Sequence, residues 1–453
     1  MGSDSSRPLL ITLFLGVLMA ALDIAVLGPA IPAIRAHFGV DDRTVAWAFN
    51  TFVFFNLLGV PIMSKAADVF GRRRVYLVDI SLFVAGAIVV AAAPTFAVLL
   101  VGRALQGLAA SGIFPVAAAV VGDRFEPAKR GRALGVLGAV FGVAFILGPI
   151  LAGVLLRIDW RLIYLAFLPL AAVVVPMARR HIEPGAGNPG ASIDVIGLAL
   201  LGLVLVPMAY GINQIDTSDL GSTAMNPRVW SALLVTAIAL PVFVRHQGRS
   251  SDPVVRPGLF RSRQVVLAAL LASCAGLAES AFIFLPAFSV SAFGVTGSQA
   301  SFMLLPLVSA VAITSPIAGR VLDRVGSKVV ILACQGLLLA GFVIVATLGT
   351  QVTWYYAGSV LIGAGLAGIL GPALSYILLH EARVSERTVS QGLITLFISV
   401  GQLVGGAAIG AVAASSGPGI DGYESGFTWI AVFCGLVFVA ALALKSLEAE
   451  RAG

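Results

Sequence analysis

The segment LGVLMAALDIAVLGPAIP (residues 15–32) is long and apolar enough to form the middle of a membrane-spanning helix. It carries one aspartate, Asp23, with apolar residues on both sides. An ionised carboxylate in hydrocarbon costs on the order of 3 kcal/mol or more, so acids inside such helices are rare and tend to serve a function. The fold around Asp23 must therefore supply the carboxyl group with water, a partner or a proton.

The composition of the whole chain fits a membrane protein. Of its 453 residues, 59% are apolar and 11% are charged, and the mean hydropathy is +1.00. Soluble domains carry about 25% charged residues, so this chain has too few to cover a water-soluble fold. Its apolar runs are continuous, whereas the strands of a membrane barrel alternate polar and apolar residues. We therefore expect an all-α polytopic membrane protein.

Continuous apolar runs occur fourteen times along the chain. They lie at residues 9–33, 45–66, 75–94, 97–121, 132–156, 161–178, 193–213, 228–245, 264–290, 298–320, 328–349, 353–379, 388–414 and 425–445. Longer polar segments at 181–194 and 246–263 flank the seventh and eighth runs. They predict a six-helix bundle in residues 1–185, a two-helix insert with flanking linkers in 186–250, and a second six-helix bundle in 251–453.

The positions of the basic residues predict the orientation in the membrane. If the N-terminus is cytoplasmic, most of the 29 Lys and Arg residues fall on the cytoplasmic side. The opposite side then holds Arg35, Arg43, Arg157, Arg161 and Arg228. Cytoplasmic loops of membrane proteins carry such an excess. We expect a multi-pass protein of the cell (plasma or inner) membrane with both termini in the cytoplasm, and its net charge of +7 needs no nucleic-acid partner.

The two predicted bundles repeat a loop pattern. The segment SKAADVFGRRR (64–74) follows the second helix of the first bundle, and GRVLDRVGSK (319–328) follows the second helix of the second bundle. Aligning the aspartates of the two segments also aligns a glycine and a basic residue. Repeated halves with a site between them are a common plan of membrane transporters.

These segments resemble the major facilitator superfamily, in particular its fourteen-helix drug:proton antiporter branch, over the whole chain. The second loop keeps most of the family's loop motif, whereas the first has Ser64 and Val69 at two of the motif positions. Further similarity lies in VGRALQGLAASGIFP (101–115), GVLGAVFGVAFILGPILAG (135–153) and DWRLIYLAFLP (159–169). The resemblance implies the major facilitator fold with helices arranged as 6+2+6. It also implies proton-coupled efflux of hydrophobic or cationic drugs or metabolites by alternating access.

Asp23 and Glu279 are the candidate proton and cation sites. Each lies in the middle of the first helix of its half, and the resemblance implies that these helices line a central cavity. Desolvation favours the neutral form of a carboxyl group, so an acid in such a cavity can bind and release a proton, and its ionised form attracts a cationic substrate. We expect both acids to face this water-accessible cavity. The alternative is that either acid is only a structural hydrogen-bonding or ion-pairing group.

Arg103 and Asp79 are the other charged residues that stand out within the predicted helices. A buried cation needs an acidic partner or water, and we hypothesise that Arg103 pairs with Asp23. The resemblance links the equivalent arginine to proton transfer. The alternative is that Arg103 extends to the membrane surface. Asp79 follows the basic run at 72–74 by a few residues, so we expect it near the membrane interface with a basic partner.

Two further groups of residues take their predicted roles from the resemblance. The repeated loops and the end of the fourth helix are expected to form a gate that closes the cytoplasmic side, with Asp68, Gly71, Arg72, Arg73, Asp123, Asp323, Arg324 and Gly326. The alternative is a topology signal combined with a tight turn. The fifth helix is expected to make a tight, bendable contact that seals the cavity, or simply to pack closely, through Gly142, Gly148, Pro149 and Gly153.

Polar and aromatic residues of other helices are candidates for the cavity wall. They are Asn50, Asn56, Gln106, Phe282, Gln335, Tyr376 and Gln402. Together with the two acids they suggest a site for a small amphipathic or cationic substrate. The three cysteines, Cys274, Cys334 and Cys434, lie far apart inside apolar runs and are expected to be small core residues.

The sequence has no helix-borne metal motif, nucleophile elbow or phosphate-binding loop. We therefore expect a transporter rather than an enzyme, with no cofactor besides the coupling protons and no metal, working as a monomer in the lipid bilayer. Two other functions stay open. The chain could export an endogenous lipid or fatty-acid-like compound, or it could be an uncoupled facilitator or a ligand-sensing membrane protein.

Overall fold

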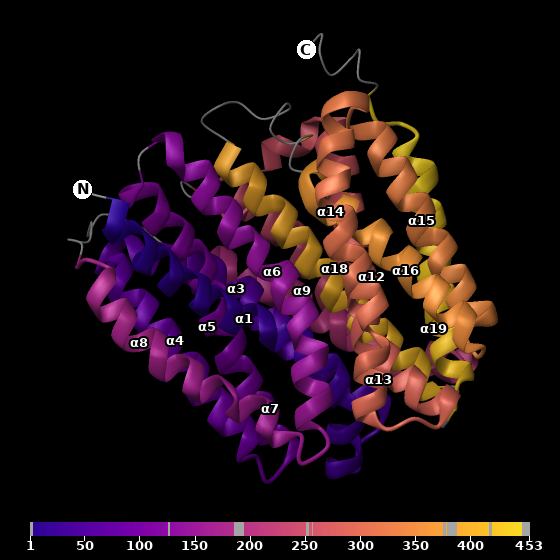
Figure 1. Ribbon diagram of the computed structural model, residues 1–453. Helices are drawn as coiled ribbons and strands as arrows, with labels where there is room; N and C mark the ends of the chain where they lie inside the picture. Colours follow the sequence, from indigo (N-terminus) through magenta and orange to yellow (C-terminus); the bar gives the residue numbers. More distant parts are fainter. Residues whose placement is uncertain are drawn as a thin grey trace.

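The computed structural model describes residues 3–125, 127–184, 194–250, 253–255, 257–374, 377, 387–415 and 419–445. Over these residues the secondary structure is helical and contains no strand, which confirms the predicted all-α class. Figure 1 shows two bundles side by side, the first in indigo and purple and the second in orange and yellow. The first helix begins and the last helix ends toward the top of this view. We call that end the terminal side and the opposite end the distal side.

The helices follow the predicted order. The first half contains α1 (Ser3–Phe38), α2 (Asp42–Val45), α3 (Trp47–Phe70), α4 (Arg72–Ala91), α5 (Phe96–Arg124), α6 (Pro127–Leu155), α7 (Arg161–Leu165) and α8 (Phe167–His181). The insert contains α9 (Val195–Asn213), α10 (Leu220–Met225) and α11 (Pro227–Gln247). The second half contains η1 (Pro257–Arg261), α12 (Arg263–Phe293), α13 (Gly297–Met303), α14 (Leu305–Val325), α15 (Ser327–Leu348), α16 (Val352–Gly368), η2 (Ile369–Ala373), α18 (Arg387–Ser415) and α19 (Asp421–Ala441).

The number of membrane-crossing helices agrees with the predicted arrangement. Within the part of the chain that the structure describes, 13 helical segments are long and apolar enough to cross a membrane. Three of these segments consist of two consecutive helices each, namely α2 with α3, α7 with α8, and α13 with α14. The remaining predicted run, 353–379, corresponds to α16 followed by the π-helical turn η2. The 6+2+6 arrangement therefore accounts for the fold.

The two halves repeat their internal packing. In the first half α1 packs on α6, and α5 packs on both α4 and α3; in the second half α12 packs on α18, and α16 packs on both α15 and α14. A side-chain carbon added at Gly86 would lie 2.8 Å from the carbonyl oxygen of Gly102, and one added at Gly341 would lie 2.8 Å from that of Gly358. Small residues thus let the same helix pair approach closely in each half.

The repeated loops share an unusual backbone geometry. Gly71, between α3 and α4, has φ 87° and ψ 140°, and Gly326, between α14 and α15, has φ 81° and ψ 172°. This region of backbone space is open essentially to glycine alone. The alignment of these two glycines, made from the sequence, therefore corresponds to a shared structural requirement. Each one lets the chain reverse direction between two long helices.

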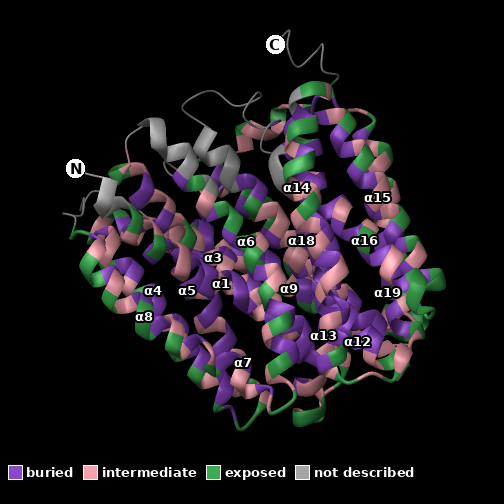
Figure 2. Cartoon of the chain, viewed as in Figure 1, coloured by how far each residue is buried: buried purple, intermediate pink, exposed green. Residues whose placement is uncertain are grey.

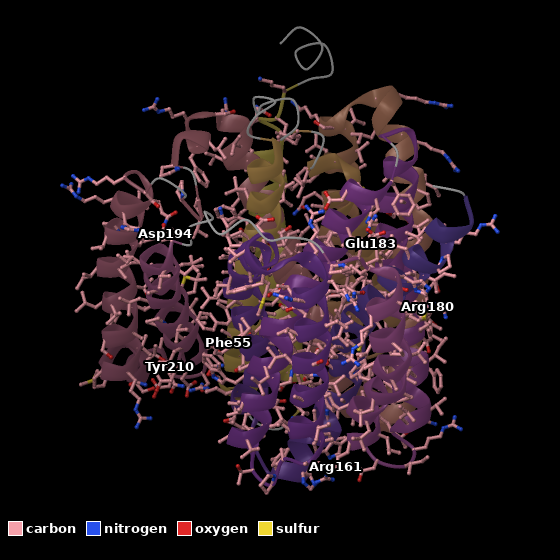
Figure 3. The ribbon with its side chains drawn as sticks, turned by 90° about the vertical axis from the view of Figure 1, so that its left-hand side faces the viewer. Phe55, Arg161, Arg180, Glu183, Asp194 and Tyr210 are labelled. Atoms are coloured by element: carbon pink, nitrogen blue, oxygen red, sulfur yellow. The ribbon has the colours of Figure 1, made fainter. Side chains whose placement is uncertain are left out.

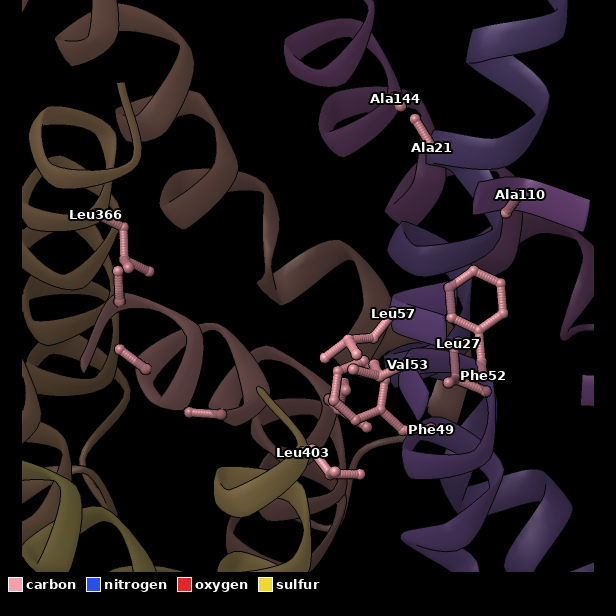
Figure 4. Close-up of a cluster of buried hydrophobic side chains, with 14 of the residues drawn as sticks. Ala21, Leu27, Phe49, Phe52, Val53, Leu57, Ala110, Ala144, Leu366 and Leu403 are labelled. Carbon is pink, nitrogen blue, oxygen red and sulfur yellow. The ribbon is translucent and has the colours of Figure 1, made fainter. Parts of the chain in front are cut away.

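α3 connects the two halves through its two faces. In the close-up of Figure 4, Phe52 points toward Leu27 of α1, whereas Phe49 and Val53 point toward Leu403 of α18. All of these side chains belong to one continuous apolar core. Figure 2 shows buried residues through the interior of both bundles and exposed residues on their outer surfaces. The halves therefore share a packed interface rather than forming separate globules.

The insert lies against both halves. α9 packs on α11, and also on α18 and α3; Asp194 and Tyr210 mark its two ends in Figure 3. At the distal end, the Asn213 side chain accepts a hydrogen bond from Trp47 Nε1 (3.1 Å) and donates to the carbonyl oxygens of Arg43 (3.2 Å) and Ala407 (3.5 Å). One buried amide thus bonds to the first half and to the second.

We expect Gly326→Ala to destabilise the fold, because alanine would be strained at a positive φ. The expected loss is about 1–3 kcal/mol in the free energy of unfolding. Thermal unfolding of the purified protein in detergent measures it. Gly248→Ala is the matched control, since Gly248 has φ −70° and an added carbon there meets only ordinary contacts at 3.6 Å or more. Equal unfolding temperatures for the two variants would contradict the argument.

Candidate functional site

The centre of the first half holds a buried cluster of Asp23, Arg103 and Gln106. Arg103 Nη1 donates to Asp23 Oδ2 (2.7 Å) and to Gln106 Oε1 (2.9 Å), and Gln106 Nε2 donates to Asp23 Oδ1 (3.0 Å). Asp23 and Arg103 form an ion pair in which both side chains are 0% exposed. The three groups close a ring in which each bonds to the other two. The hypothesis that Arg103 pairs with Asp23 is confirmed, and its extension to the membrane surface is excluded.

The local sequence explains why Arg103 lies at this depth. α5 begins at Phe96, where the Thr95 side chain caps it by accepting from Val98 N (3.4 Å). Arg103 is therefore about two turns from the distal end of its helix. A carbon added at Gly107 would strike the backbone of Phe52, so this glycine lets α3 approach α5 closely.

The backbone and the rings of neighbouring helices complete the surroundings of Arg103. Arg103 Nε donates to the carbonyl oxygen of Ala48 on α3 (2.9 Å). The guanidinium carbon lies 4.6 Å from the centre of the Phe52 ring and 6.0 Å from that of Tyr164. In the described part of the chain, Arg103 Nη2 and the Tyr164 hydroxyl have no hydrogen-bond partner. The cation is thus held by one carboxylate, one amide, one carbonyl and an aromatic face.

Asp23 is not water-accessible in this conformation, so the expectation that it faces an open cavity is wrong for it. Its side chain is fully buried, and the pocket between the halves does not include it. The physical reason is that Arg103 reaches it from α5 and neutralises its charge. Removing one partner of such a buried pair costs about 3–5 kcal/mol, because the other charge is left uncompensated.

Glu279 lies in a different environment, at a pocket between the two halves. Gln402 Nε2 donates to Glu279 Oε2 (2.8 Å), and both residues line the pocket. The remaining wall is apolar or backbone, from Ile24, Ala25, Gly28, Phe49, Phe145, Pro149, Phe282, Ile283, Leu304, Leu307 and Val308. Glu279 is therefore the acid that faces a space between the halves. Among the described residues, no basic side chain lines this pocket.

The predicted wall residues divide into two groups. Phe282 and Gln402 line the pocket, and Gln106 belongs to the buried cluster. Asn56 Nδ2 donates to the carbonyl oxygen of Gly107 at 3.4 Å and is part of the α3–α5 packing. Tyr376 lies outside the described residues.

Asn50 and Gln335 do not line the pocket. Asn50 is buried where α3 crosses α18 beside Gly406, and its amide atoms have no partner in the described chain. Gln335 lies inside the second half, where it donates to Cys274 Sγ (3.3 Å) and to the carbonyl oxygen of Cys434 (3.0 Å). For Gln335 the expected cavity position is therefore wrong, because the polar face of α15 is turned toward α12 and α19.

The distal part of α6 forms a tight seam with its neighbours. A carbon added at Gly148 would strike Ala25 of α1, and one added at Gly153 would contact the Phe302 ring of α13. At Gly142, nearer the terminal side, an added carbon meets nothing within 4 Å. Of the predicted close-packing positions, Gly148 and Gly153 are therefore tight and Gly142 is open.

Two serines that the sequence analysis did not identify bond to this seam. Ser301 Oγ donates to the carbonyl oxygen of Pro149 (2.6 Å), and Ser298 Oγ donates to that of Gly153 (2.5 Å). The two serines are three residues apart in α13 and so lie on the same face of the helix. They fasten the second half to the first on the distal side. The sequence signal that could have identified them is a pair of serines three residues apart, just after the first helix of the second half.

A second distal contact involves Arg35, Asp42 and Tyr423. Arg35 Nη1 donates to Asp42 Oδ2 (2.7 Å), and the Tyr423 hydroxyl of α19 donates to Asp42 Oδ1 (2.8 Å). Both halves therefore contribute to one hydrogen-bonded cluster at the distal end. Together with the serines, this contact joins the two halves on the distal side.

On the terminal side, Arg72 forms an ion pair with Asp123 and donates to the carbonyl oxygen of Ala119 (2.5 Å). Asp68 and Arg324 are exposed, and Arg73 is partly buried. Among the predicted gate residues, Asp123 rather than Asp68 is therefore the partner of Arg72. The side chain of Asp323 lies outside the described part.

Asp79 differs from its predicted environment. It is fully buried, and neither carboxylate oxygen has a hydrogen-bond partner among the described residues. Its side chain lies against Gly112 of α5. The prediction of an interfacial position with a basic partner is therefore wrong. α4 turns this residue toward the interior of the bundle, away from the basic run at its start.

Two halves built of helices long enough to cross a membrane, with a pocket between them that Glu279 lines, follow the common plan of membrane transport proteins. Residues 13–313 and 268–452 match the family model described as the Major Facilitator Superfamily. The chain belongs to this superfamily.

Curated relatives have transport names. The chain is 30% identical to the multidrug resistance protein Stp of Mycobacterium tuberculosis (strain CDC 1551 / Oshkosh) over 421 residues, which cover 90% of this chain and 77% of that protein. It is 27% identical to the multidrug transporter protein MdtP of Bacillus subtilis (strain 168), over 91% of this chain and 76% of the relative. These names support a transporter rather than an enzyme.

Solved structures share the fold. A mutant of the nucleoside transporter NupG matches with a TM-score of 0.69 and 13% identity, over 96% of this chain and 99% of that one. The human organic anion transporter MFSD10 (TETRAN) matches with a TM-score of 0.64 and 18% identity, over 97% and 100%. At these identities the likeness concerns the fold alone.

We expect Asp23→Leu or Arg103→Leu alone to lower the free energy of unfolding by about 3–5 kcal/mol, because each leaves an unpaired buried charge. The double variant is expected to lose less than the sum of the two single losses. Thermal unfolding in detergent of the wild type, both single variants and the double variant checks this. Additive losses would contradict a direct pair.

We expect Gly148→Val to destabilise the protein by about 1–3 kcal/mol, because the added carbons press on Ala25 across a packed seam. Gly142→Val, on the same helix, is the matched control and should leave the stability close to that of wild type. Unfolding temperatures in detergent compare the two. Equal losses at both glycines would show that α6 is packed alike along its length.

Proposed function

We propose that the protein is a proton-coupled antiporter of the cell membrane that exports hydrophobic or cationic amphipathic molecules by alternating access. The observation that carries the proposal is that the two acids of the paired first helices, α1 and α12, have different surroundings. Asp23 is neutralised by Arg103 in the interior of one half, whereas Glu279 lies at the pocket between the halves with Gln402 as its partner. The multidrug names of Stp and MdtP support the same direction of transport.

The pocket fits a molecule with an apolar body and a positive charge. Phe49, Phe145 and Phe282 come from three helices and offer apolar and aromatic surface. The Glu279 carboxylate provides the negative charge, and aromatic faces add to the attraction for a cation. Because the described lining of the pocket contains no basic residue, an anionic ligand would meet repulsion from the Glu279 carboxylate. The substrate class is therefore cationic or neutral.

The coupling step acts on the Asp23–Arg103 pair. When Asp23 binds a proton, the ion pair is lost. Among the described residues, Gln106, the Ala48 carbonyl and the aromatic rings are then left to compensate the charge of Arg103. An uncompensated buried charge is costly, so protonation favours a conformation that admits water or another partner to Arg103. Since α1 and α5 carry the two charges, the proton alters how these helices pack together.

For the pocket to become accessible from the other side of the membrane, the distal contacts must open. By the basic-residue rule the terminal side is cytoplasmic, so the distal side faces out of the cell. The Ser301–Pro149 and Ser298–Gly153 hydrogen bonds close that side here. We assign this conformation to the step of the cycle in which the substrate enters the pocket from the cytoplasm. Opening of the seam between α6 and α13 then releases the substrate and admits protons from outside.

The test uses proteoliposomes with an imposed pH gradient and a fluorescent lipophilic cation. We expect the gradient to drive transport by the wild type and not by Asp23→Asn. Glu279→Gln is expected to weaken the apparent affinity for the cation about tenfold, since losing a charged partner costs about 1.5 kcal/mol.

Two results would contradict the proposal. Wild-type flux that is the same with and without the gradient would indicate an uncoupled facilitator. Gradient-driven flux that Glu279→Gln leaves unchanged for the cation, but that a fatty-acid-like compound inhibits, would indicate a lipid exporter. Ser81→Ala, an exposed serine on α4, serves as the control variant in both assays.

A further inference from the structure

Asp79 is a buried acid that the proposed mechanism does not use. Its side chain is 0% exposed, and both carboxylate oxygens are without a hydrogen-bond partner in the described structure. Its carboxylate contacts the position of Gly112 on α5, next to Met63 of α3. Tyr76, one turn earlier on α4, is its titratable neighbour, and the Tyr76 hydroxyl donates instead to the carbonyl oxygen of Thr12 at 3.3 Å.

The helices around Asp79 leave its charge without compensation. α4 packs against α3, α5, α7 and α8. Among their described residues, none places a basic side chain within ion-pair distance of Asp79. This differs from Asp23, which has Arg103 at 2.7 Å. An ionised carboxylate with no partner in a low-dielectric interior is far costlier than a neutral one, so the geometry favours the protonated form of Asp79 in this conformation.

Asp79 also lies on the same helix seam as the Asp23 cluster. Gly86 of α4 faces Gln106 of α5, and Asp79 of α4 faces Gly112 of α5. Seven residues separate Gly86 from Asp79, which places Asp79 about 10 Å nearer to the terminal side.

The terminal end of the seam carries charges that reach water. Arg72 begins α4 and pairs with Asp123, which is 57% exposed, near the end of α5. Acidic groups therefore occur at three levels between the centre of the first half and its terminal surface. Asp79 lies between Asp23 and Asp123. In the described chain it is the acid of these three that has no basic partner.

We propose that Asp79 is a second proton-carrying residue of the first half, which holds its proton in this conformation and releases it to water on the terminal side when substrate loads. The step breaks the O–H bond of the carboxyl group, leaves a carboxylate and transfers the proton to water, with no change of oxidation state. The inference rests on the proposed antiport. It adds a residue that lies outside both the Arg103 cluster and the pocket.

The experiment measures the protons released when a lipophilic cation binds to the purified protein. The protein is held in weakly buffered detergent solution with a pH-indicator dye, and the wild type is compared with Asp79→Asn. The asparagine has nearly the same shape but cannot lose a proton. Asp79→Asn is expected to release about one proton fewer per bound cation than the wild type, and Ser81→Ala to release the wild-type number.

The outcomes separate this inference from the proposed function. If the wild type releases protons and Asp79→Asn releases the same number, Asp79 is not a carrier, while the antiport stands. If the wild type binds the cation without releasing any proton, both ideas fall.

A second measurement applies if Asp79→Asn is not monodisperse on gel filtration. The double variant Asp23→Asn/Glu279→Gln, which keeps Asp79, is then studied instead. Its infrared difference spectrum on cation binding shows whether a protonated carboxyl group loses its absorption. A remaining loss supports Asp79. A flat spectrum in the carboxyl region overturns the inference.

Discussion

The ion pair between Asp23 and Arg103 is the constraint on which the first half is built. Two charges without contact with water are tolerated in the membrane interior only if they meet with good geometry and gain further hydrogen bonds. Here a single Nη1 atom bonds to both the aspartate and Gln106, and Nε bonds to the backbone of α3. α1, α3 and α5 must therefore hold one mutual arrangement. The close approach at Gly107 makes this arrangement possible.

The second half uses the same architecture without the same electrostatics. Its helix pairs repeat those of the first half, with glycine contacts at the same crossings. Glu279 lies near the middle of α12, as Asp23 does of α1, yet it bonds to the neutral Gln402. One acid is therefore compensated and sealed, whereas the other is uncompensated and faces the pocket. For the antiport proposed above, this asymmetry supplies separate places for a proton and for a cation.

The distal seam between α6 and α13 is held by hydroxyl groups that donate to backbone carbonyls. Ser298 and Ser301 donate to carbonyl oxygens of α6 rather than to charged groups. Such hydrogen bonds contribute about 0.5–1.5 kcal/mol each, because water competes for the same atoms once the seam opens. In the proposed transport cycle, a seam of this strength can close the distal side and still open. The buried amide of Asn213 joins the insert to both halves at the same end.

The sequence by itself determined the helical class, the 6+2+6 arrangement and the repeated glycine turns, because hydrocarbon demands long apolar helices and positive φ demands glycine. It also singled out Asp23, Arg103 and Glu279, since charge is rare in such helices. Only the tertiary structure decided which of these charges is sealed and which meets the pocket. Gln335 and Asp79 were misplaced for the same reason: a continuous apolar run does not reveal which face of a helix turns inward. That orientation depends on neighbours distant in the chain, as the pairing of α1 with α5 shows.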